Sequence, residues 1–389
     1  MQFTSFNPTR IHFGEGMFSQ LGQIAAPYGT RAMLVTGRCA MERSGHLQKA
    51  LDMLAAAGMD VEVFNRVPAN PPLGLCEQGA LVAREFGAEC IIALGGGSSI
   101  DAAKAIAVGA THDEPLKSFL FPREDGTKPS PTDATLPVVA VTSTAGTSSE
   151  MTPFAVISVS ETHEKTAIAG PAVYPKEAIQ DPELTYSAPA EVTAATGVDV
   201  LCHSVEGYIS TVATPLVDAM AERAIGLVGR SLAAAVADGG NTQARRDMML
   251  GDCFAGYVLS QTGGNIMHAV EHPMSGHHPD IAHGAGLASV LVGWARMMWE
   301  RDTGKFAFIA RALGVTDCDD AAAASRAPDA LQSLLESVGL SIRLRELGIA
   351  EEMLPTLVDD ALRYMGGAVA KTLGGATRAD LLDLLRASY

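Results

Sequence analysis

The segment AECIIALGGGSSIDAAKAIAVGA, residues 88–110, combines an apolar run, a turn of three glycines and a second, longer apolar pattern. The first run is short and apolar, as in a buried strand, and IDAAKAIAVGA after the glycines is typical of a helix. The segment therefore predicts a strand that passes through a tight turn directly into a helix.

The same alternation surrounds this segment on both sides. Strands are predicted at 31–37, 60–67, 137–144 and 153–160, with amphipathic helices at 44–59 and 75–87. Alternating strands and helices predict a parallel sheet that helices cover on both faces. We therefore expect an α/β domain of the Rossmann-like type in the first half of the chain.

After Asp181 and Pro182 the pattern changes to long helices, which continue to Tyr389 with almost no strand signal. A chain of 389 residues is long enough for two cores. We expect an α/β domain over residues 1–185 and an all-α domain over residues 186–389.

The composition excludes several classes of partner. The formal net charge is −16, which would repel nucleic acid and anionic membranes. The start of the chain has no basic segment followed by an apolar run, and no apolar stretch approaches membrane-spanning length. Six scattered cysteines without a CxxC pair are typical of reduced thiols, so we expect a cytoplasmic protein.

The glycine turn has the parts of a diphosphate site. Gly95, Gly96 and Gly97 allow a phosphate to approach the backbone, and Ser98 or Ser99 is expected to cap the following helix. The N-terminus of a helix favours an anion. A plain strand–helix turn is the alternative, since the motif is neither GxGxxG nor a P-loop.

A second small-residue loop, VTSTAGTSSEMT at residues 141–152, carries seven hydroxyls and one carboxylate at the end of a predicted strand. Ligands collect at the carboxyl ends of strands in open parallel sheets. A polar turn without function explains the loop about equally well.

Five of the ten histidines lie between Asn265 and Gly284. His268 and His272 are four residues apart, and Pro273 suggests that their helix ends there. Asp199 and His203 have the same spacing in another helical segment, so each pair shares one helix face.

A carboxylate with three imidazoles suits Fe(II) or Zn(II) and leaves a position open for a substrate oxygen. Any single histidine would more often be structural, but two such pairs followed by His283 favour a metal site in the helical domain. Spacing alone does not say which histidines bind.

Five segments together resemble the iron-containing (group III) alcohol dehydrogenase family, which has the dehydroquinate synthase-like fold. They are GGGSSIDAAKAIA, TSTAGTSSEMT, AIQDPELT, GVDVLCHSVEGYIS and HAVEHPMSGHHPDIAHGAGLA. The similarity runs in order across nearly the whole chain. It implies that residues 1–185 form a Rossmann-like, dinucleotide-binding domain and that residues 186–389 form a helical metal-binding and catalytic domain. It also implies an active site in the cleft between them and a homodimer or higher homo-oligomer.

The resemblance also implies a role for each histidine. The family's metal ligands fall on Asp199, His203, His268 and His283. His272 matches a histidine near the nicotinamide and is a candidate for proton transfer, so Asp199 and His272 are the expected catalytic residues. His277 and His278 lie in a stretch that varies in the family and are expected at the rim of the pocket.

For the cofactor, the resemblance implies a set of residues from the glycine turn, the hydroxyl loop and two neighbouring segments. The set comprises Asn70, Gly96, Gly97, Ser98, Ser143, Thr144, Thr147 and Lys165. After the strand RAMLVT, many NAD-using members carry an Asp. This chain has Gly37 at that position, followed by Arg38. Without the carboxylate, a 2′-phosphate is not repelled and the guanidinium could pair with it, which favours NADP(H) over NAD(H). Arg38 could instead be merely solvated, with both cofactors used.

The implied reaction is metal-dependent hydride transfer between NAD(P)(H) and a small alcohol or aldehyde, with Fe(II) expected and Zn or Mn possible. A hydroxy acid or a diol is an alternative substrate. A lyase or cyclase of the dehydroquinate synthase type would need clustered basic residues, which the segments around Asp199 and His268 lack. The remaining alternatives are a metal hydrolase, in which the glycine turn is purely structural, and a non-catalytic binding protein.

Overall fold

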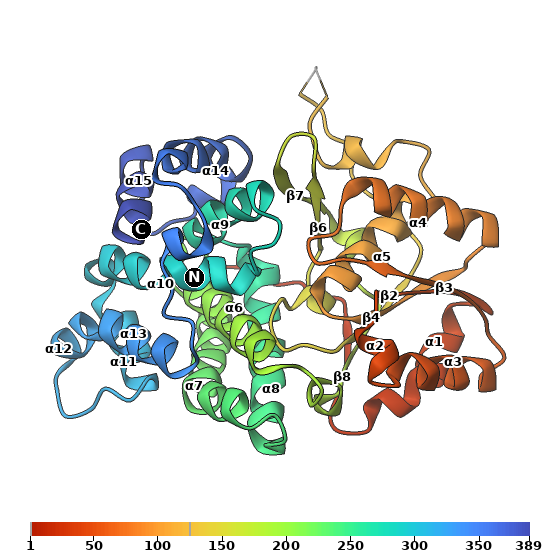
Figure 1. Cartoon of the computed structure of the whole chain (residues 1–389), viewed down its shortest axis with the longest axis horizontal. Coiled ribbons are helices and arrows are strands. Elements are labelled where there is room, and N and C mark those ends of the chain that lie inside the picture. Colours follow the sequence, from red (N-terminus) through yellow and green to blue (C-terminus); the bar gives the residue numbers. More distant parts are fainter. Residues whose placement is uncertain (1, 124–125) are drawn as a thin grey trace. The chain divides into compact units, whose positions relative to one another are not determined.

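The computed structural model describes residues 2–123 and 126–389, which form two compact units. One unit, the sheet unit, comprises residues 6–144 and 148–187. The other, the helical unit, comprises residues 2–5, 145–147 and 188–389. Figure 1 shows strands with covering helices in the first and helices in the second, which confirms the predicted α/β plus all-α fold class.

Six parallel strands form the sheet, in the order β1-β8-β5-β4-β2-β3. Their bounds are β1 Arg10–Phe13, β2 Arg31–Gly37, β3 Asp60–Val67, β4 Cys90–Gly95, β5 Val138–Thr142 and β8 Glu177–Gln180. A separate antiparallel pair consists of β6 Phe154–Val159 and β7 Glu164–Ala169. The pattern analysis did not predict β1, β7 or β8, of which β1 and β8 are only four residues long.

Helices cover both faces of the sheet, and the buried side chains alternate accordingly. Met33 and Ile91 point into a core under α4 (Leu73–Phe86) and α5 (Gly97–Gly109). Leu34 and Ile92 join the opposite core. That core lies under α1 Leu21–Ala25, α2 Ala40–Arg43 and α3 His46–Ala56, on the other side of the sheet in Figure 1. Burial on both faces explains why these strands are continuously apolar in sequence.

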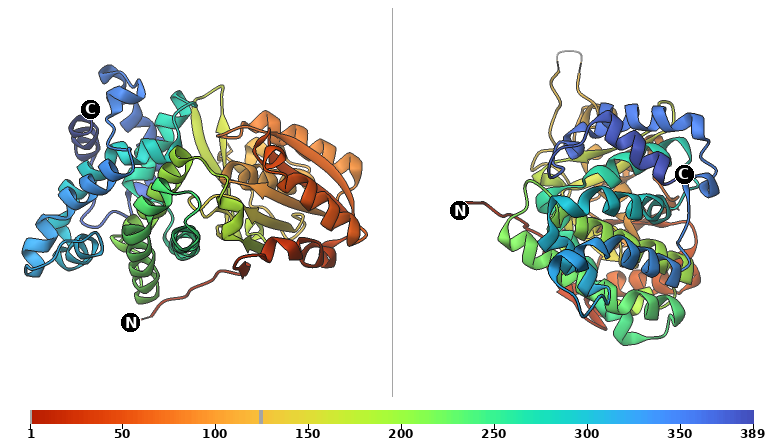
Figure 2. Two further views of the ribbon diagram at one scale, coloured as in Figure 1. Left: turned by 60° about the horizontal axis from the view of Figure 1, so that its bottom comes forward. Right: turned by 90° about the vertical axis from the view of Figure 1, so that its left-hand side faces the viewer.

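The helical unit is built around α6, Ala190–Tyr208, which is buried over most of its length. The other helices are α7 Pro215–Ala237, α8 Thr242–Thr262, α9 Ile266–His277, α10 His283–Met298, α11 Thr303–Ala312, α12 Asp320–Ser325, α13 Ala327–Ser337, α14 Leu354–Val369 and α15 Arg378–Ala387. Figure 2 shows this part of the chain, coloured green to blue, as helices joined by loops. A Cβ on Gly197 would lie 2.2 Å from Leu232 Cδ1, so this glycine lets α7 pack directly against α6.

Two local predictions were wrong. α5 begins at Gly97 with Gly96 as its N-cap, so Ser98 and Ser99 lie in the first turn and neither side chain caps the helix. α9 does not end at Pro273 but continues to His277. Proline removes its own N–H and crowds the carbonyl of the residue four positions earlier, yet the helix continues beyond it, where Met274 and Ser275 are buried. Among the described residues, no helix is both long and apolar enough to cross a membrane.

Candidate active site

Three helices bring the four predicted metal ligands to a single carboxylate oxygen. On α6, Oδ1 of Asp199 lies 3.4 Å from Nε2 of His203, one helical turn away. The same oxygen lies 3.5 Å from Nε2 of His268 on α9. It lies 3.8 Å from Nε2 of His283, the first residue of α10.

A glycine makes this convergence possible. Gly284 follows His283 directly, and a Cβ at this position would lie only 1.9 Å from the carbonyl oxygen of Ala195 on α6. The start of α10 therefore touches the backbone of α6. Any other residue at position 284 would force the two helices apart and carry His283 away from Asp199.

The polar atoms at the centre of this cluster fit a metal ion. Asp199 is only 2% exposed, and its Oδ1, like Nε2 of His268, has no hydrogen-bond partner among the described residues. The rings of His203 and His268 are stacked, with centroids 4.6 Å apart. Ligand atoms of Asp199, His268 and His283 all lie within 4.8 Å of one another. Buried carboxylate and imidazole atoms without donors are costly unless a cation satisfies them.

The charges of the cluster also suit a cation. Burial raises the pKa of Asp199, but the neighbouring histidines lower it to about 2, so the group is a carboxylate at neutral pH. Burial lowers the pKa of His203 to about 4, which leaves a neutral imidazole able to bind metal. Burial also lowers the pKa of His268, but Glu206 and Asp199 raise it to about 10, which marks this position as favourable for positive charge.

Two buried glutamates lie against the histidines, and the sequence analysis did not single them out. Oε2 of Glu206 lies 2.5 Å from Nδ1 of His268. Oε2 of Glu271 contacts Nδ1 of His283. A signal existed for the first, because Glu206 lies two turns after Asp199 on the same face of α6. For the second, the only signal was a glutamate beside His272 in an otherwise apolar stretch.

His272 lies beside this cluster. It is buried, and its ring centroid is 5.8 Å from that of His283 and 6.5 Å from that of His268. Glu271, His272 and His283 form a second set whose potential ligand atoms lie within 4.8 Å of one another.

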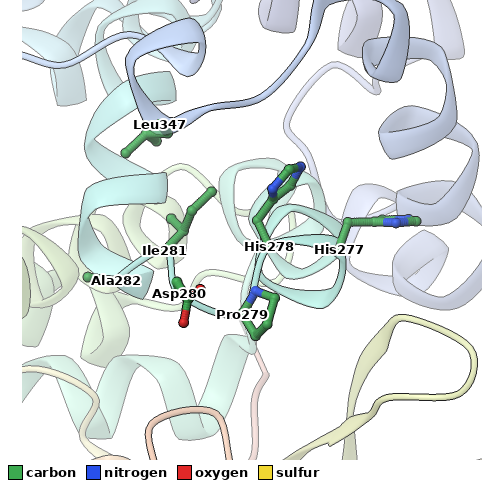
Figure 3. A pocket seen from close by; sticks show the side chains of 7 residues that line it. All are labelled: His277, His278, Pro279, Asp280, Ile281, Ala282 and Leu347. Atoms are coloured by element: carbon green, nitrogen blue, oxygen red, sulfur yellow. The ribbon is translucent and has the colours of Figure 1, made fainter.

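His277 and His278 take a different place, shown in Figure 3. A pocket of about 470 Å³ is lined by the continuous segment His277–Ala282 together with Leu347. The His277 ring points away from the other lining side chains, and its Nε2 pairs with Oδ2 of Asp360 at 2.9 Å. None of the four clustered ligands lines this pocket.

In the sheet unit, the glycine turn and the hydroxyl loop meet. Gly95 has φ +151°, and a Cβ there would lie 2.7 Å from Oγ of Ser99. A Cβ on Gly96 would lie 3.1 Å from Oγ1 of Thr144, and the backbone N–H of Ser143 donates to the carbonyl of Gly95 at 3.0 Å. The two predicted loops thus form one backbone-lined surface at the carboxyl ends of β4 and β5.

Two neighbouring strands contribute to the same edge. The backbone N–H of Asn70, a residue with φ +51°, donates to Oγ of Ser98 at 3.3 Å. Gly37 ends β2, and a Cβ there would lie 3.6 Å from the carbonyl oxygen of Val67 and 3.8 Å from Oγ of Ser99. These are ordinary contact distances, so packing does not require a glycine at position 37. Arg38, which follows, is exposed.

Two members of the predicted set lie elsewhere in the two units. Lys165 is buried on β7. Burial raises the pKa of Asp101 to about 6, although the charge of Lys165 lowers it. Thr147 belongs to the loop Ala145–Thr147, which clusters with the helical unit. A Cβ on Gly146 would lie 2.5 Å from Cβ of Thr196, so this loop packs tightly on α6.

A buried lysine that the sequence analysis missed holds the hydroxyl loop. Lys104 on α5 is 1% exposed, and its ammonium donates to the carbonyl oxygens of Ser149, Thr152 (2.9 Å) and Phe154 (2.7 Å). It also donates to Oγ of Ser149, which in turn donates to Oδ1 of Asp101 at 2.5 Å. The only sequence signal was one lysine inside an otherwise apolar helix.

Two family models match this chain. "Iron-containing alcohol dehydrogenase" matches residues 8–182, and "Fe-containing alcohol dehydrogenase family, C-terminal" matches residues 193–389. The chain belongs to the iron-containing alcohol dehydrogenase family. The enzyme is therefore an oxidoreductase of small alcohols that uses a metal ion and a nicotinamide dinucleotide, and the match favours this activity over the lyase and hydrolase alternatives.

Relatives with known names agree with this assignment. The enzyme is 36% identical to 1,3-propanediol dehydrogenase from Klebsiella pneumoniae, over 92% of this chain and 91% of that protein. It is 33% identical to choline dehydrogenase from Bacillus subtilis, over 92% and 88% of the two chains. The solved structure of an archaeal halo-thermophilic alcohol dehydrogenase from a Red Sea brine pool superposes with a TM-score of 0.95, at 36% identity and over 100% and 99% of the two chains.

Proposed function

We propose that Asp199, His203, His268 and His283 bind the enzyme's metal ion and that this ion is Fe(II). The observation that carries the proposal is that one buried oxygen, Oδ1 of Asp199, lies 3.4–3.8 Å from Nε2 of all three histidines. Zn(II) and Mn(II) accept the same ligands, so metal content has to be measured rather than read from the ligand set.

A bound divalent ion at this position supplies Lewis acidity toward an alcohol or carbonyl oxygen. For two of the proposed ligands, the chain's own contribution is to hold them in their binding forms. The pKa values of about 2 for Asp199 and about 4 for His203 leave a carboxylate and a neutral imidazole at neutral pH, so neither has to lose a proton when the metal binds.

We propose that His272 exchanges the proton that the alcohol loses or the aldehyde gains. Its ring lies 5.8 Å, centroid to centroid, from that of His283, and it belongs to a buried stretch of α9 that excludes bulk water. An imidazole in this position suits general acid–base catalysis near neutral pH.

For the nucleotide, we propose that the turn Gly96–Ser98 and the hydroxyls of Ser143 and Thr144 hold the diphosphate. Backbone N–H groups at the start of α5 and the close approach of the two loops support this assignment. Asn70, Thr147 and Lys165 are proposed as further cofactor-binding residues, with Lys165 near a ribose of the cofactor.

We propose a preference for NADP(H) over NAD(H). At the end of β2, Gly37 offers no carboxylate to a 2′-hydroxyl although a side chain would fit, and the next residue is the exposed cation Arg38. Arg38 makes no hydrogen bond or ion pair with the described residues, so its guanidinium is available to a 2′-phosphate.

As substrates we propose primary alcohols and their aldehydes, with short diols next because a related protein is a 1,3-propanediol dehydrogenase. Hydroxy acids rank below these, since the described segments around Asp199 and His268 carry no arginine or lysine to pair with a second carboxylate. We expect a homodimer or higher homo-oligomer, which light scattering would measure, and a cytoplasmic location.

The decisive experiment is nicotinamide oxidation at 340 nm with butyraldehyde after anaerobic loading with Fe(II), with a chelator-treated control. Metal-dependent oxidation, faster with NADPH than with NADH, is the expected result. Protein that holds one metal ion but oxidises neither nucleotide would contradict the proposed substrate class, and 1,3-propanediol and hydroxy acids would then be assayed in the oxidative direction.

A further inference from the structure

Two of the proposed metal-binding histidines each lie between two carboxylates. Nδ1 of His268 is 2.5 Å from Oε2 of Glu206, whereas its Nε2 faces Oδ1 of Asp199 at 3.5 Å. His283 is placed in the same way: its Nδ1 contacts Oε2 of Glu271 and its Nε2 lies 3.8 Å from Asp199. Both glutamates are buried, with at most 1% of their surface exposed.

A neutral imidazole has one N–H and one lone pair. When Nδ1–H donates to a glutamate, the lone pair is on Nε2, which is the atom that faces Asp199 in both histidines. We infer that Glu206 and Glu271 are positioning residues that fix the tautomer and ring orientation of His268 and His283 for metal binding. The inference rests on the metal site proposed above, and a carboxylate behind a ligand histidine is a common device for strengthening the ligand.

Glu206 is itself held rigidly. It accepts hydrogen bonds from the backbone N–H of Asn265 at 3.1 Å and of Met267 at 2.5 Å, at the start of α9. These N–H groups have no partner within the helix, so Glu206 acts as a cap supplied by α6. The same carboxylate thus sets where α9 begins and how the His268 ring is turned.

Glu271 is held by a hydrogen bond within its own helix, and a glycine on the next helix leaves room for it. Oγ of Ser275, one turn later on α9, donates to Oε1 of Glu271. On α10, a Cβ at Gly286 would lie 2.8 Å from Cγ of Glu271 and 3.1 Å from its Oε1. A glycine at position 286 therefore leaves the space that the glutamate occupies.

His203 provides the contrast that explains the pattern. Its Nδ1 has no hydrogen-bond partner among the described residues. His203 and Asp199 share α6, so the helix itself places them on one face. His268 and His283 come from other helices and each has a glutamate behind it.

A competing role for Glu271 is direct metal binding, since Glu271, His272 and His283 could hold an ion of their own. One oxygen of Glu271 accepts from Ser275 and the other faces Nδ1 of His283, which favours the positioning role. The two roles differ in stoichiometry: positioning requires one bound ion, direct binding a second.

The test uses the whole metal-free protein titrated anaerobically with Co(II), a coloured substitute for Fe(II). The dissociation constant is measured by chelator competition, and the visible absorption reports the ligand geometry. We expect one Co(II) per chain, a 10–100-fold weaker affinity for Glu271→Met, and a smaller loss with an altered spectrum for Glu271→Gln and Glu206→Gln. Glu222→Gln, which removes the charge from the acceptor of the Tyr208 hydroxyl in the same unit, is the matched control and should bind as the wild type does.

Gly286→Ala tests the same inference without removing a polar group, because its methyl must displace Glu271. Circular dichroism of the metal-free variants separates weaker binding from loss of the fold. Wild-type affinity and spectrum in Glu271→Met or Gly286→Ala would overturn the inference, as would a second Co(II) per wild-type chain. Asp199→Ala separates a failure of this inference from a failure of the proposed metal site. If this variant still binds Co(II) stoichiometrically, the proposed metal site itself is wrong.

Discussion

Oδ1 of Asp199 lies 3.5 Å from Nε2 of His268, although the two residues belong to different helices separated by α7 and α8. Neither atom has a hydrogen-bond partner among the described residues. This pair is the centre of the proposed metal site.

Removing the shared carboxylate should abolish metal binding. Asp199→Ala is expected to lose bound iron and to lower kcat/KM by roughly a hundredfold or more, since the Lewis acid goes with it. Metal content by elemental analysis, measured beside activity on the same sample, checks the prediction. Asp252→Ala, a buried carboxylate on α8 outside the ligand set, serves as a control for the loss of a buried aspartate. An active, metal-free Asp199→Ala enzyme would refute the assignment.

A change at His272 should separate catalysis from metal binding. His272→Asn is expected to keep its iron, because His272 is not among the four proposed ligands, and to lose roughly 10²–10⁴-fold in kcat through the missing proton transfer. The pH–rate profile should lose the limb that the imidazole contributes. Unchanged kcat in an iron-loaded variant would remove His272 from the mechanism.

The proposed nucleotide preference should be reversible at one position. A Cβ at position 37 would lie at ordinary contact distances of 3.6 and 3.8 Å from its nearest neighbours, so Gly37→Asp can introduce a carboxylate without moving the backbone. Repulsion of the 2′-phosphate and new hydrogen bonds to ribose hydroxyls should shift the ratio of kcat/KM for NADPH and NADH by about 10–100-fold toward NADH. Gly37→Asn, which introduces a side chain of the same size without the charge, should shift it much less. A wild-type enzyme that prefers NADH would contradict the role given to Arg38.

Lys104 should link stability to pH. Burial lowers its pKa from 10.5 to about 8. Because the folded value lies below the unfolded one, this group lowers stability below pH 8, and the penalty disappears as pH rises to 10.5. The free energy of unfolding of the wild type should therefore rise by roughly 2–3 kcal/mol between pH 8 and 10.5 relative to Lys104→Met. Urea titrations of both proteins across this range provide the measurement, and parallel curves would contradict the prediction.

The same substitution, Lys104→Met, should loosen the hydroxyl loop, which is proposed to bind the nucleotide, at neutral pH. Lys104→Met leaves the buried carbonyl oxygens of Thr152 and Phe154 without their donor, a cost of about 1–3 kcal/mol each. KM for the nucleotide should rise while iron content stays constant, because Lys104 belongs to the sheet unit and the ligands to the helical unit. Loss of iron would show that the effect is general unfolding.

A single methyl group at the start of α10 should disturb the metal site. Gly284→Ala places a Cβ 1.9 Å from the carbonyl oxygen of Ala195, so α10 must move and His283 with it. We expect a loss of about 1–3 kcal/mol in the free energy of unfolding together with weaker iron binding. Gly226→Ala in α7, where nothing lies within 4 Å, should be neutral or slightly stabilising. Equal behaviour of the two variants in chemical denaturation would contradict the packing argument.

Sequence patterns predicted the elements whose own residues determine them. The continuous apolar runs of β2 and β4 and the i,i+4 spacing of Asp199 and His203 are local signals, and the structure contains the corresponding strands and helix. β8 was not predicted because its four residues, Glu177–Gln180, are mostly polar or small. They become a strand only between β1 and β5. The continuation of α9 past Pro273 was missed because burial against other helices, not local preference, decides it.

The candidate site follows the same rule. The proposed ligand set came from spacing together with the family resemblance, whereas Glu206 and Glu271 did not, since their partners come from other helices or from a position twelve residues away. Lys104 was missed for a similar reason: its acceptors lie in a loop that only the fold brings to α5. Pairings of this kind leave no periodic trace in the sequence.

The capping of α9 by Glu206 has a consequence for how the enzyme responds to the supply of iron. An ion held by α6, α9 and α10 would act as a cross-link between three segments, and such a ligand stabilises the folded state by about 4 kcal/mol at a thousandfold excess over its dissociation constant. The start of α9 and the orientation of His268 depend on one carboxylate, so an empty site and a frayed helix end are expected to occur together. In a cell short of iron, the apoenzyme should then be the form that proteases degrade first, and its abundance would follow the metal supply without a dedicated sensor.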